Sequence, residues 1–512
     1  MHLGVDLGTT RTIVAAVDRG NYPVVTFLDD DGDAHESFPS VVALHGERLL
    51  YGFDAIAAGA TGAPLLRSFK RALAEPDVNA DTAIAVGDRT VPLLEILTGY
   101  LRAMHEALLT TSNLPGAGTG QADPDLLGPV VVAVPAHAHG AQRFLTLEAF
   151  RRAGFDVAAL LNEPSAAGFE YTHRRGGTVT SRRTRVVVYD LGGGTFDASL
   201  VDVEGTGHDV LATAGRNRLG GDDFDDVLVR CALAAAEVEE ADLDAWALAS
   251  LREQCREAKE RISPQSRRIA LEVGERDVNV AVDAFYDAAA PLVEATMTAM
   301  GPVLDRLDDP TGLTDVAGIY LVGGGSSLPL VPRLLKERFG RRVHRSPHPS
   351  ASTAIGLAIA ADPASGYSLA DRLSRGFGVF REQRSGQGVV FDPILTPDEI
   401  LPTADTVVAT RRYRAAHNIG WFRFVECAAV DDAGEPRGDI VPFAEVLFPF
   451  DPALRDRPDL GDEPVRRQDG CLVEERYVID PNGIVEVHIT DLDTGYELRR
   501  TIAGRAAPGA ST

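Results

Sequence analysis

The segment from residue 186 to residue 197 carries the residue types that a phosphate and metal site needs. An apolar strand runs into Asp190, and three consecutive glycines, 192–194, precede Thr195 and Asp197. Glycine can adopt positive φ and lets backbone N–H groups approach phosphate oxygens, which a Cβ atom would hold away. A carboxylate at a strand end can hold hydrated Mg²⁺. We interpret the segment as a hairpin that binds phosphate and metal, with an ordinary glycine-rich turn as the alternative for this motif alone.

The chain opens with a second motif of the same kind. Residues 3–7 form a short apolar strand that contains Asp6, and Gly8, Thr9 and Thr10 follow directly. The order of carboxylate, glycine and hydroxyl groups repeats that of the central segment. Two such hairpins could hold one polyphosphate from opposite sides, so the pair favours a phosphate site more strongly than either turn alone.

Two further glycine turns follow along the chain. Gly220 and Gly221 lead into a predicted helix, whose N-terminal N–H groups are a natural place for phosphate. The glycines 323–325 follow the apolar strand 319–322, and an adenosine could rest on their backbone. No Gly-Lys pair occurs in the sequence, so this nucleotide site is not a P-loop.

Lysine is rare in this sequence, and its positions are therefore informative. Of 50 basic side chains only three are lysine, at Lys70, Lys259 and Lys336. A compact ammonium directed at one phosphate oxygen is not easily replaced by a planar guanidinium, whereas a solvated charge is. Lys70 and Lys259 are therefore candidate ligands, with a surface lysine as the alternative for Lys70. Lys336 is predicted to lie on a helix surface.

Glu163 lies where a predicted strand passes into a predicted helix, and Pro164 occupies the first helical turn, where its missing N–H is harmless. A carboxylate at this junction could simply cap the helix. The alternative is that Glu163 orients an attacking water molecule.

Composition limits the class of protein. At 512 residues the chain is long enough for about two to four domains. A net charge of -25 argues against binding to nucleic acid or anionic lipid. No membrane span or export signal is recognisable, so a cytoplasmic location is expected. Four widely spaced cysteines indicate reduced thiols rather than disulfides or a zinc site.

Hydrophobic periodicity places the motifs on elements. It predicts strands over residues 40–44 and 129–135. Helices are predicted over residues 142–153, 243–262 and 332–339. From about residue 376 the sequence is strand-rich, with apolar segments at 407–410, 421–425, 445–448 and 484–489 and a hairpin turn at 480–483.

Taken in this order, the motifs resemble those of the DnaK-type heat-shock 70 kDa chaperones, which have the actin and sugar-kinase fold. Residues 4–10 are similar to the first phosphate motif of that family, 190–197 to the second and 321–325 to the adenosine motif. Residues 162–167 match its catalytic-glutamate segment, and Lys70 falls where the family keeps its catalytic lysine. Residues 134–136, with Gln142 and Arg143, are similar to the segment that passes the nucleotide state to the neighbouring domain.

The resemblance implies an α/β fold: an actin-like (ribonuclease H-like, duplicated) two-lobed ATPase domain followed by a β-sandwich domain. It implies ATP hydrolysis with Mg²⁺ held mostly through water by Asp6 and Asp190, and K⁺ as a further cation. Lys70 would steady the attacking water and the γ-phosphate. The implied catalytic residues are Asp6, Lys70, Glu163, Asp190, Thr195 and Asp197. The implied nucleotide-binding residues are Gly8, Thr9, Thr10, Gly192, Gly193, Gly194, Thr195, Gly220, Gly221, Lys259, Ser263, Gly323, Gly324 and Gly325.

Several positions depart from the family pattern. Arg256 stands where the family has an acid, Ser327 replaces an arginine that packs on the purine, and Ser350 replaces an aspartate. We therefore expect weaker or less base-selective nucleotide binding. Ala159 replaces an arginine that contacts a J-domain cochaperone, and the linker, residues 363–375, lacks the leucine-rich acidic signature. These two departures argue against coupling to a J-domain cochaperone, although the family also implies such a partner and a nucleotide-exchange factor.

The strand-rich region is similar to the family's β-sandwich for unfolded or extended polypeptide clients. We expect Trp421, Phe422 and Phe424 to be core residues rather than client-facing ones. An acidic, proline-rich insertion spans residues 451–469, and no helical lid is expected after the sandwich. A client held without a lid should leave quickly.

The sequence thus predicts an ATPase domain over residues 1–362, a linker over 363–375, a β-sandwich over 376–504 and a disordered tail over 505–512. The leading hypothesis is an ATP-dependent chaperone for extended polypeptides. A second is an ATP-gated adaptor that binds one dedicated protein and hardly turns over. A third, a small-molecule kinase of the same fold, is disfavoured by the β-rich C-terminal region and the Glu163 segment.

Overall fold

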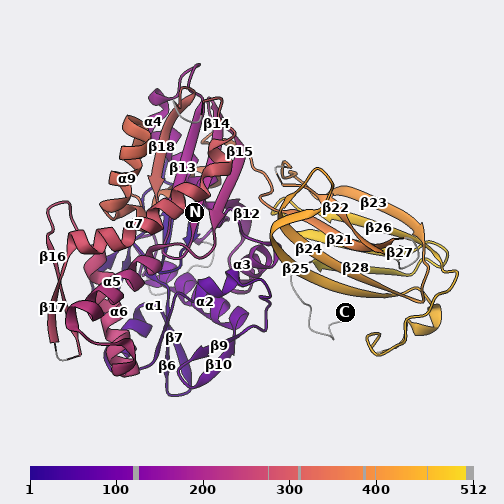
Figure 1. The fold of residues 1–512 in the computed structure, drawn as a ribbon, viewed down its shortest axis with the longest axis horizontal. Coiled ribbons are helices and arrows are strands. Elements are labelled where there is room, and N and C mark those ends of the chain that lie inside the picture. The colour runs from indigo at the N-terminus through magenta and orange to yellow at the C-terminus, as the bar shows by residue number, and fades with distance from the viewer. Residues whose placement is uncertain are drawn as a thin grey trace. The chain divides into compact units, whose positions relative to one another are not determined.

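The computed structural model describes residues 1–118, 126–274, 276–309, 313–383, 388–397, 399–457 and 459–502. Two compact units emerge from the contacts within the chain (Figure 1). Unit 1 comprises residues 1–71, 102–137 and 155–369, and unit 2 comprises residues 72–101, 138–154 and 370–512. The predicted tail, 505–512, lies outside the described residues, as does part of the loop before the strand at 129–135. The domain limits expected from the sequence stay a prediction.

The first sheet of unit 1 contains the opening motif. Its strand order is β12-β11-β1-β2-β5. Strands β1 and β2 form the antiparallel hairpin expected at the start of the chain, whereas β1, β11 and β12 are parallel. Strand β11, Val-Val-Val-Ala-Val, is buried along its whole length, as parallel strands covered on both faces are. The strands are β1 (Leu3–Leu7), β2 (Arg11–Ala16), β5 (Phe38–Pro39), β11 (Val130–Val134) and β12 (Val157–Asn162).

The second sheet of unit 1 contains the central motif. Its order is β19-β18-β13-β14-β15-β20. Strands β13 and β14 form an antiparallel hairpin that pairs Asp190 with Asp197, and β13 runs parallel to β18. The two sheets thus each offer a hairpin whose turn carries carboxylates, glycines and hydroxyls. The strands are β13 (Arg185–Leu191), β14 (Phe196–Glu204), β15 (Gly207–Arg216), β18 (Val316–Val322), β19 (Val343–Arg345) and β20 (Ser368–Ala370).

Two helices pack closely against each other and on these sheets. Helix α4 (Glu163–Arg175) begins at Glu163 with Pro164 in its first turn, and helix α10 (Ser352–Ala361) crosses it. A Cβ atom at Gly356 would lie 1.8 Å from the carbonyl oxygen of Ala166. A Cβ atom at Gly4 would lie 2.3 Å from the amide nitrogen of Ala358. Only glycine lets α10 approach both α4 and β1 this closely.

The remaining elements of this part of the chain surround the two sheets. Helices α5 and α6 pack together and on the β16-β17 hairpin. The elements are β3 (Phe27–Leu28), β4 (Ala34–His35), β6 (Val41–His45), β7 (Arg48–Tyr51), α1 (Gly52–Ala60), β8 (Leu65–Arg67), η1 (Phe69–Ala74), η3 (Gly176–Thr178), α5 (Gly221–Ala236), η4 (Glu240–Asp242), α6 (Ala245–Glu260), β16 (Arg268–Val273), β17 (Arg276–Ala281), α7 (Val282–Ala299), α8 (Gly301–Leu304), η5 (Gly324–Ser327), α9 (Leu330–Phe339) and η6 (Gly340–Arg342).

The C-terminal part of unit 2 is a sandwich of two antiparallel sheets, ordered β22-β21-β24-β25 and β23-β26-β27-β28. Phe422 and Phe424 lie in its core, as predicted, but Trp421 is 57% exposed and that expectation was wrong. Trp421 alternates with these two residues along β24 and so points to the other face. The strands are β21 (Gly376–Gln383), β22 (Gly388–Leu395), β23 (Thr406–Arg414), β24 (Ile419–Val430), β25 (Pro436–Pro449), β26 (Leu472–Ile479), β27 (Val485–Asp491) and β28 (Glu497–Ile502), with η8 (Pro452–Leu454).

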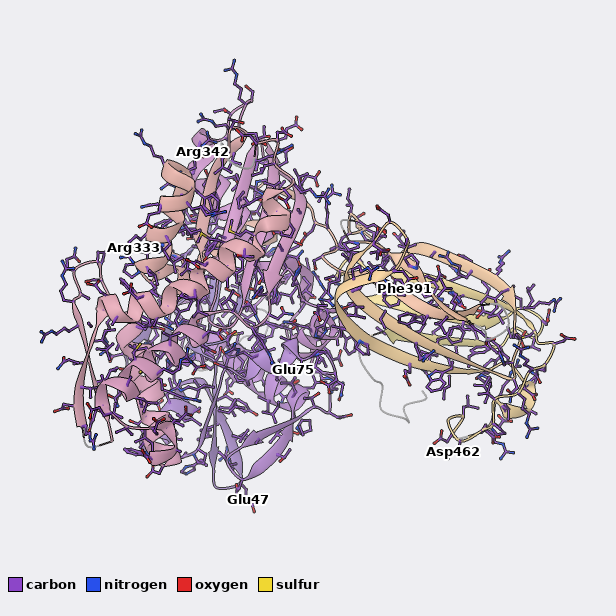
Figure 2. All side chains as sticks on the ribbon, in the orientation of Figure 1. Glu47, Glu75, Arg333, Arg342, Phe391 and Asp462 are labelled. Carbon is purple, nitrogen blue, oxygen red and sulfur yellow. The ribbon has the colours of Figure 1, made fainter. Side chains whose placement is uncertain are left out.

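A smaller apolar cluster occupies the opposite face of the sheet that contains β21 and β24. Phe391 of β22, labelled in Figure 2, is 4% exposed and packs with Val425 and Cys427 of β24. Phe380 of β21 is paired with Phe391 and joins this cluster. The sheet is therefore apolar on both faces here.

A charged network links the two sheets of the sandwich. Arg381 of β21 donates to both carboxylate oxygens of Glu475 of β26, at 2.9 and 2.7 Å, and Glu475 is fully buried. The hydroxyls of Tyr413 and Tyr477 also donate to Glu475. Arg381 further contacts Asp392 at 2.7 Å. Every buried charge in the network thus has an opposite partner.

Other segments of unit 2 contact the sandwich. Helix α3 (Gly140–Arg152) begins beside the Glu426 carboxylate, which accepts the N–H of Gly140 at 3.0 Å. Arg143 donates to the carbonyl of Asn482 at 3.1 Å. Burial raises the pKa of Glu426 to about 7, although Arg375 opposes this. The other elements are β9 (Ala83–Val86), β10 (Arg89–Pro92) and α2 (Leu93–Thr110), which continues into unit 1 from residue 102.

The predicted elements agree with the structure to within a few residues. The helix expected over 243–262 is α6, and that over 332–339 is α9, where Lys336 is exposed. Lys70 lies on the short 3-10 helix η1. The four cysteines are free, as expected, and Cys255 and Cys427 are buried. Within the described residues, every helix is too short or too polar to span a lipid bilayer.

Candidate functional site

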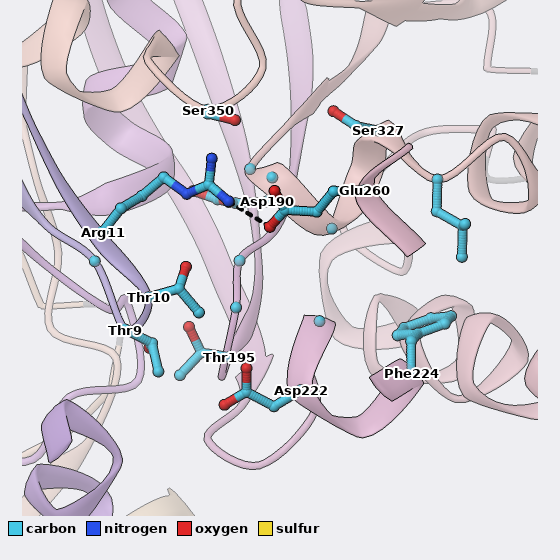
Figure 3. A pocket seen from close by; sticks show the side chains of 18 of the residues that line it. Thr9, Thr10, Arg11, Asp190, Thr195, Asp222, Phe224, Glu260, Ser327 and Ser350 are labelled. Carbon is cyan, nitrogen blue, oxygen red and sulfur yellow. Dashed lines mark hydrogen bonds and ion pairs between the residues drawn. The ribbon is translucent and has the colours of Figure 1, made fainter. Parts of the chain in front are cut away.

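A cavity of about 270 Å³ in unit 1 gathers the motif residues of both sheets (Figure 3). Residues from four separate glycine turns and from helices α4, α5 and α6 form its walls. The predicted site residues in its lining are Asp6, Gly8, Thr9, Thr10, Lys70, Glu163, Asp190, Gly192, Gly193, Thr195, Gly221, Lys259, Gly323, Gly324 and Gly325.

The glycine turns interlock, which explains their residue type. A Cβ atom at Gly194 would lie 2.9 Å from Oγ1 of Thr9, and one at Gly220 would lie 2.6 Å from the carbonyl of Gly193. The Gly221 N–H donates to the carbonyl of Gly192 at 2.9 Å. No side chain fits between the turns, so backbone amides and the hydroxyl of Thr9 lie at the cavity wall.

Gly323 adds a conformational requirement. Its φ is +81°, a left-handed conformation that other residues rarely adopt, and a Cβ atom there would lie 2.4 Å from Oδ1 of Asp190. The turn after β18 is thereby held directly against the Asp190 carboxylate.

Three carboxyl groups share this region: those of Asp190 and Asp197 are buried, and that of Asp6 is partly buried. Burial, with repulsion from Glu163, raises the pKa of Asp6 to about 7 and that of Asp197 to about 8. The pKa of Asp190 is raised well above its usual range by burial and by the charges of Glu163 and Asp6. Lys70 lowers each of these pKa values in part. The site therefore carries excess negative potential.

Lys70 and Glu163 form the charged centre of the cavity. The ammonium Nζ of Lys70 lies 2.9 Å from Oε1 of Glu163, and both side chains are nearly buried. Burial alone would lower the pKa of Lys70, but the carboxylates of Glu163 and Asp6 outweigh it and raise the pKa. The alternative of a surface lysine is therefore wrong. Glu163 lies at the first turn of α4, but its carboxylate is engaged with this ammonium.

Lys259 joins helix α6 to the start of helix α5. Its Nζ lies 2.6 Å from Oδ1 of Asp225 and donates to the carbonyl of Gly221 at 2.6 Å. Burial raises the pKa of Asp225 to about 6, while Lys259 lowers it. Lys259 thus positions the N-terminus of α5, where a phosphate could bind.

The part of the cavity that lies away from the hydroxyls of Thr9 and Thr195 has a different lining. Ser327 and Ser350 line it, both in the upper part of Figure 3, away from Thr9 and Thr195, and Arg256 of α6 contributes as well. The guanidinium of Arg256 is paired with Glu253 one turn earlier on the helix. Arg11 of β2 and Glu260 of α6 form an ion pair in the same region. Small hydroxyl groups and paired charges are the features a nucleoside would meet here.

Four predicted site residues do not line the cavity. Gly194 and Gly220 lie where the turns contact one another, and Asp197 is buried and accepts the N–H of His137 at 3.3 Å. Ser263 turns toward Ser266, whose hydroxyl accepts its N–H at 3.1 Å. The structure thus brings Asp197 near the site but gives Ser263 a local role in the turn after α6.

Sequence reasoning missed several lining residues, chiefly Arg11, Asp225, Glu260 and Thr353. Arg11 directly follows the first phosphate motif, and Asp225 lies one helical turn after Gly221. Their nearness to these motifs in the sequence could have identified both as lining residues. Thr353, whose hydroxyl lies 3.5 Å from Oδ2 of Asp190, belongs to α10 and carried no such signal.

The donor set fits Mg²⁺ held through water. Among the described residues no group of three or more His, Cys, Asp or Glu side chains forms a ready metal cage. Mg²⁺ is commonly bound by one or two carboxylates, with water and substrate phosphates completing its shell. Asp190 is buried, Asp6 is partly buried, and the two carboxyl groups repel each other, so a bound divalent cation would relieve this repulsion.

The fold and the cavity together define an actin-like ATPase domain of the α/β class, followed by a β-rich region. Residues 123–373 match the family model described as Hsp70 protein. This segment of the chain is therefore similar to the Hsp70 family, as the motifs indicated. The matched segment contains Glu163, the central hairpin, helix α6 and the turn after β18. Members of this family are ATPases that use Mg²⁺ and act as chaperones for polypeptides.

Proposed function

We propose that this protein hydrolyses Mg²⁺-bound ATP and couples the reaction to binding of unfolded or extended polypeptide. The observation that carries the proposal is the convergence of four glycine turns, the Lys70–Glu163 pair and the carboxyl groups of Asp6 and Asp190 on one cavity. A polyphosphate requires the amides, a divalent cation requires the carboxylates, and hydrolysis requires a positioned water.

Each side chain has a task that its position supports. Bound Mg²⁺ would neutralise charge on the β- and γ-phosphates, with Asp6 and Asp190 holding its water ligands. Thr9 and Thr195, with the glycine amides, would hold phosphate oxygens. Lys70 would donate to the attacking water or to the γ-phosphate, and its 2.9 Å contact with Glu163 fixes the ammonium. Catalysis of this kind is mainly electrostatic positioning.

Polypeptide binding is assigned to the sandwich of unit 2. Strands β22, β25, β23 and β28 stand at the edges of its two sheets, and an extended chain can add to such an edge by backbone hydrogen bonds. Trp421 is exposed on β24 with the Arg423 guanidinium 5.6 Å from its ring, and it is a candidate contact for a client side chain.

Chain connectivity supports coupling between nucleotide and client. Asp197, beneath the cavity, accepts the N–H of His137 in unit 1. Three residues later Gly140 donates to Glu426 of the sandwich in unit 2. A change in the charge around Asp197 would therefore act on residues 137–140, and the last of these residues is hydrogen-bonded to the sandwich. This segment includes the residues that resemble the family's signalling region.

A second candidate is an ATP-gated adaptor that binds one protein partner and hardly turns over. The lining of small serines at 327 and 350, in place of groups that pack on a base, favours weak nucleotide engagement and hence this alternative. A cochaperone partner is proposed on family grounds alone.

Single-turnover ATP hydrolysis tests the proposal. Lys70→Ala should lower the rate constant about 100-fold or more, since loss of one transition-state donor has effects of this size. The matched control is Lys336→Ala, which removes an exposed ammonium on α9 and should leave the rate unchanged. An unfolded peptide should accelerate the wild type.

The outcomes separate the candidates. ATP binding with slow turnover that no unfolded peptide accelerates would favour the adaptor. Equal rates for the wild type and Lys70→Ala would contradict the assignment of Lys70. Phosphate appearing on an added sugar or alcohol instead of in solution would indicate a small-molecule kinase.

A further inference from the structure

An ion pair extends across the cavity between elements far apart in the chain. Arg11 belongs to β2 of the first sheet, and Glu260 is the last residue of α6, 249 positions later. Figure 3 shows the two side chains reaching toward each other from opposite sides, joined by a dashed line. Both residues line the cavity.

This pair is more exposed than the other ion pairs of the cavity. The Lys70–Glu163 pair is about one-tenth exposed, and so is the Lys259–Asp225 pair. The side chains of Arg11 and Glu260 are 40% and 46% exposed. An exposed pair contributes little free energy and is screened by salt, so it can open and close at modest cost. Its position and its weakness suit a contact that must break for a ligand to enter.

The surrounding lining gives few groups that could recognise a particular base. Ser327 and Ser350 are short, Arg256 is paired within its own helix, and Phe224 is 1% exposed. The release rate of a nucleotide bound here would therefore depend on its phosphate contacts and on any side chains that close over the nucleoside. The Arg11–Glu260 pair is placed to do the latter.

We infer that Arg11 and Glu260 form a latch over the bound nucleotide and set its rate of release, independently of the base. The inference rests on the proposed nucleotide site. Arg11 contributes a donor to the ligand side of the cavity, and Glu260 is a positioning residue that holds the guanidinium across the opening. Opening of the pair frees the path for release, so screening the pair with salt should speed release.

Release of ribose-labelled fluorescent ADP and GDP, chased with excess unlabelled nucleotide, tests the latch. Glu260→Ala and Arg11→Ala should each speed release about two- to five-fold, the range that an exposed ion pair supplies. The factor should be the same for ADP and GDP. Added salt should speed wild-type release toward that of the variants and leave the variants nearly unchanged.

Two further variants separate the pair from its individual side chains. The double variant Arg11→Glu with Glu260→Arg should restore slow release, because the pair is re-formed with its charges exchanged. The matched control is Glu257→Ala on the same helix, whose carboxylate pairs with Arg261 at 2.9 Å and does not line the cavity. It should release nucleotide at the wild-type rate.

Each contrary result has a distinct meaning. Wild-type release rates in Glu260→Ala would overturn the latch and leave nucleotide binding intact. Fast release in the exchanged double variant would show that Arg11 acts alone and would overturn the latch as a pair. Different factors for ADP and GDP would overturn its independence of the base. No binding of nucleotide by the wild type would overturn the proposed function, and the latch with it.

Discussion

Ionisation is unfavourable for three carboxyl groups of the site, those of Asp6, Asp190 and Asp197. A bound divalent cation would make their ionisation favourable. Their pKa values are raised above the ordinary 3.8 because burial and mutual repulsion disfavour the charged form. In the absence of a cation the folded protein therefore binds more protons than the unfolded chain between pH 3.8 and about 7 to 8. These groups make the free energy of unfolding fall as pH rises through that window.

The first prediction concerns protons released on binding. Mg²⁺ binds the ionised carboxylates, so binding of nucleotide premixed with Mg²⁺ should release protons near pH 7, and affinity should rise from about pH 6 to about pH 8. Asp6→Asn removes one of these groups and should reduce the release. It should also raise the melting temperature of the ligand-free protein above about pH 7, because a buried charge is lost.

Calorimetric titration in two buffers of different ionisation enthalpy measures the proton release. The matched control is Asp283→Asn, an exposed carboxylate in the first turn of α7 that should change neither quantity. Binding without proton release in the wild type would mean that the three carboxyl groups are already ionised and paired.

At the same scale, the limits of sequence reasoning are clear from particular residues. The glycines at 192–194 and 323–325 were recognisable because the backbone conformation they allow is a local property of the sequence. Lys70 was recognisable because lysine is otherwise almost absent. The Arg11–Glu260 pair was not, because it depends on where β2 and α6 lie in the fold and their own neighbours give no sign of it.

At the scale of elements, the sandwich depends on a polar contact inside its core. The Arg381–Glu475 pair joins β21 to β26, so it fixes one sheet against the other. Apolar segments predicted β23, β24, β25 and β27, but neither β21 nor β26 was predicted, and nothing in the local pattern indicated a buried glutamate on the inner face of β26. Its partner lies 94 residues away in sequence, and only the packing of the sheets brings the two together.

The second prediction is a double-mutant cycle on this pair. Glu475→Ala leaves the partly buried Arg381 guanidinium with Asp392 as its remaining charged partner, and we expect a loss of about 3–5 kcal/mol in the free energy of unfolding. Arg381→Met combined with Glu475→Val should recover most of this loss, because no unpaired charge is then buried. Recovery should be incomplete, since the hydroxyls of Tyr413 and Tyr477 lose their acceptor.

Urea unfolding followed by circular dichroism measures the cycle. The matched control is Glu474→Ala, which removes the neighbouring carboxylate of β26 from its pair with Arg412, an arginine that is 67% exposed. This change should alter stability by about 1 kcal/mol or less. A double variant as unstable as Glu475→Ala would indicate that the pair contributes a net attraction rather than relief from an unpaired charge.

At the scale of the whole molecule, the cavity and the sandwich have separate cores. The largest core of unit 1 is built on strands β13 to β18 and helices α5 to α7, and the core of the sandwich involves residues from 377 to 489. Each core buries its own apolar residues, so each can unfold as a cooperative unit. A ligand of one unit should then stabilise that unit in preference to the other.

The third prediction is that two thermal transitions respond to different changes. Mg²⁺ and a non-hydrolysable ATP analogue, at about 100 times the dissociation constant, should stabilise unit 1 by about 2.7 kcal/mol and raise only its transition. Glu475→Ala should lower only the transition of the sandwich, and the shift caused by nucleotide should persist in that variant. Differential scanning calorimetry of the full chain resolves both effects. If nucleotide and Glu475→Ala instead move one common transition, the two cores melt as a single unit, and nucleotide binding is then linked thermodynamically to the stability of the sandwich.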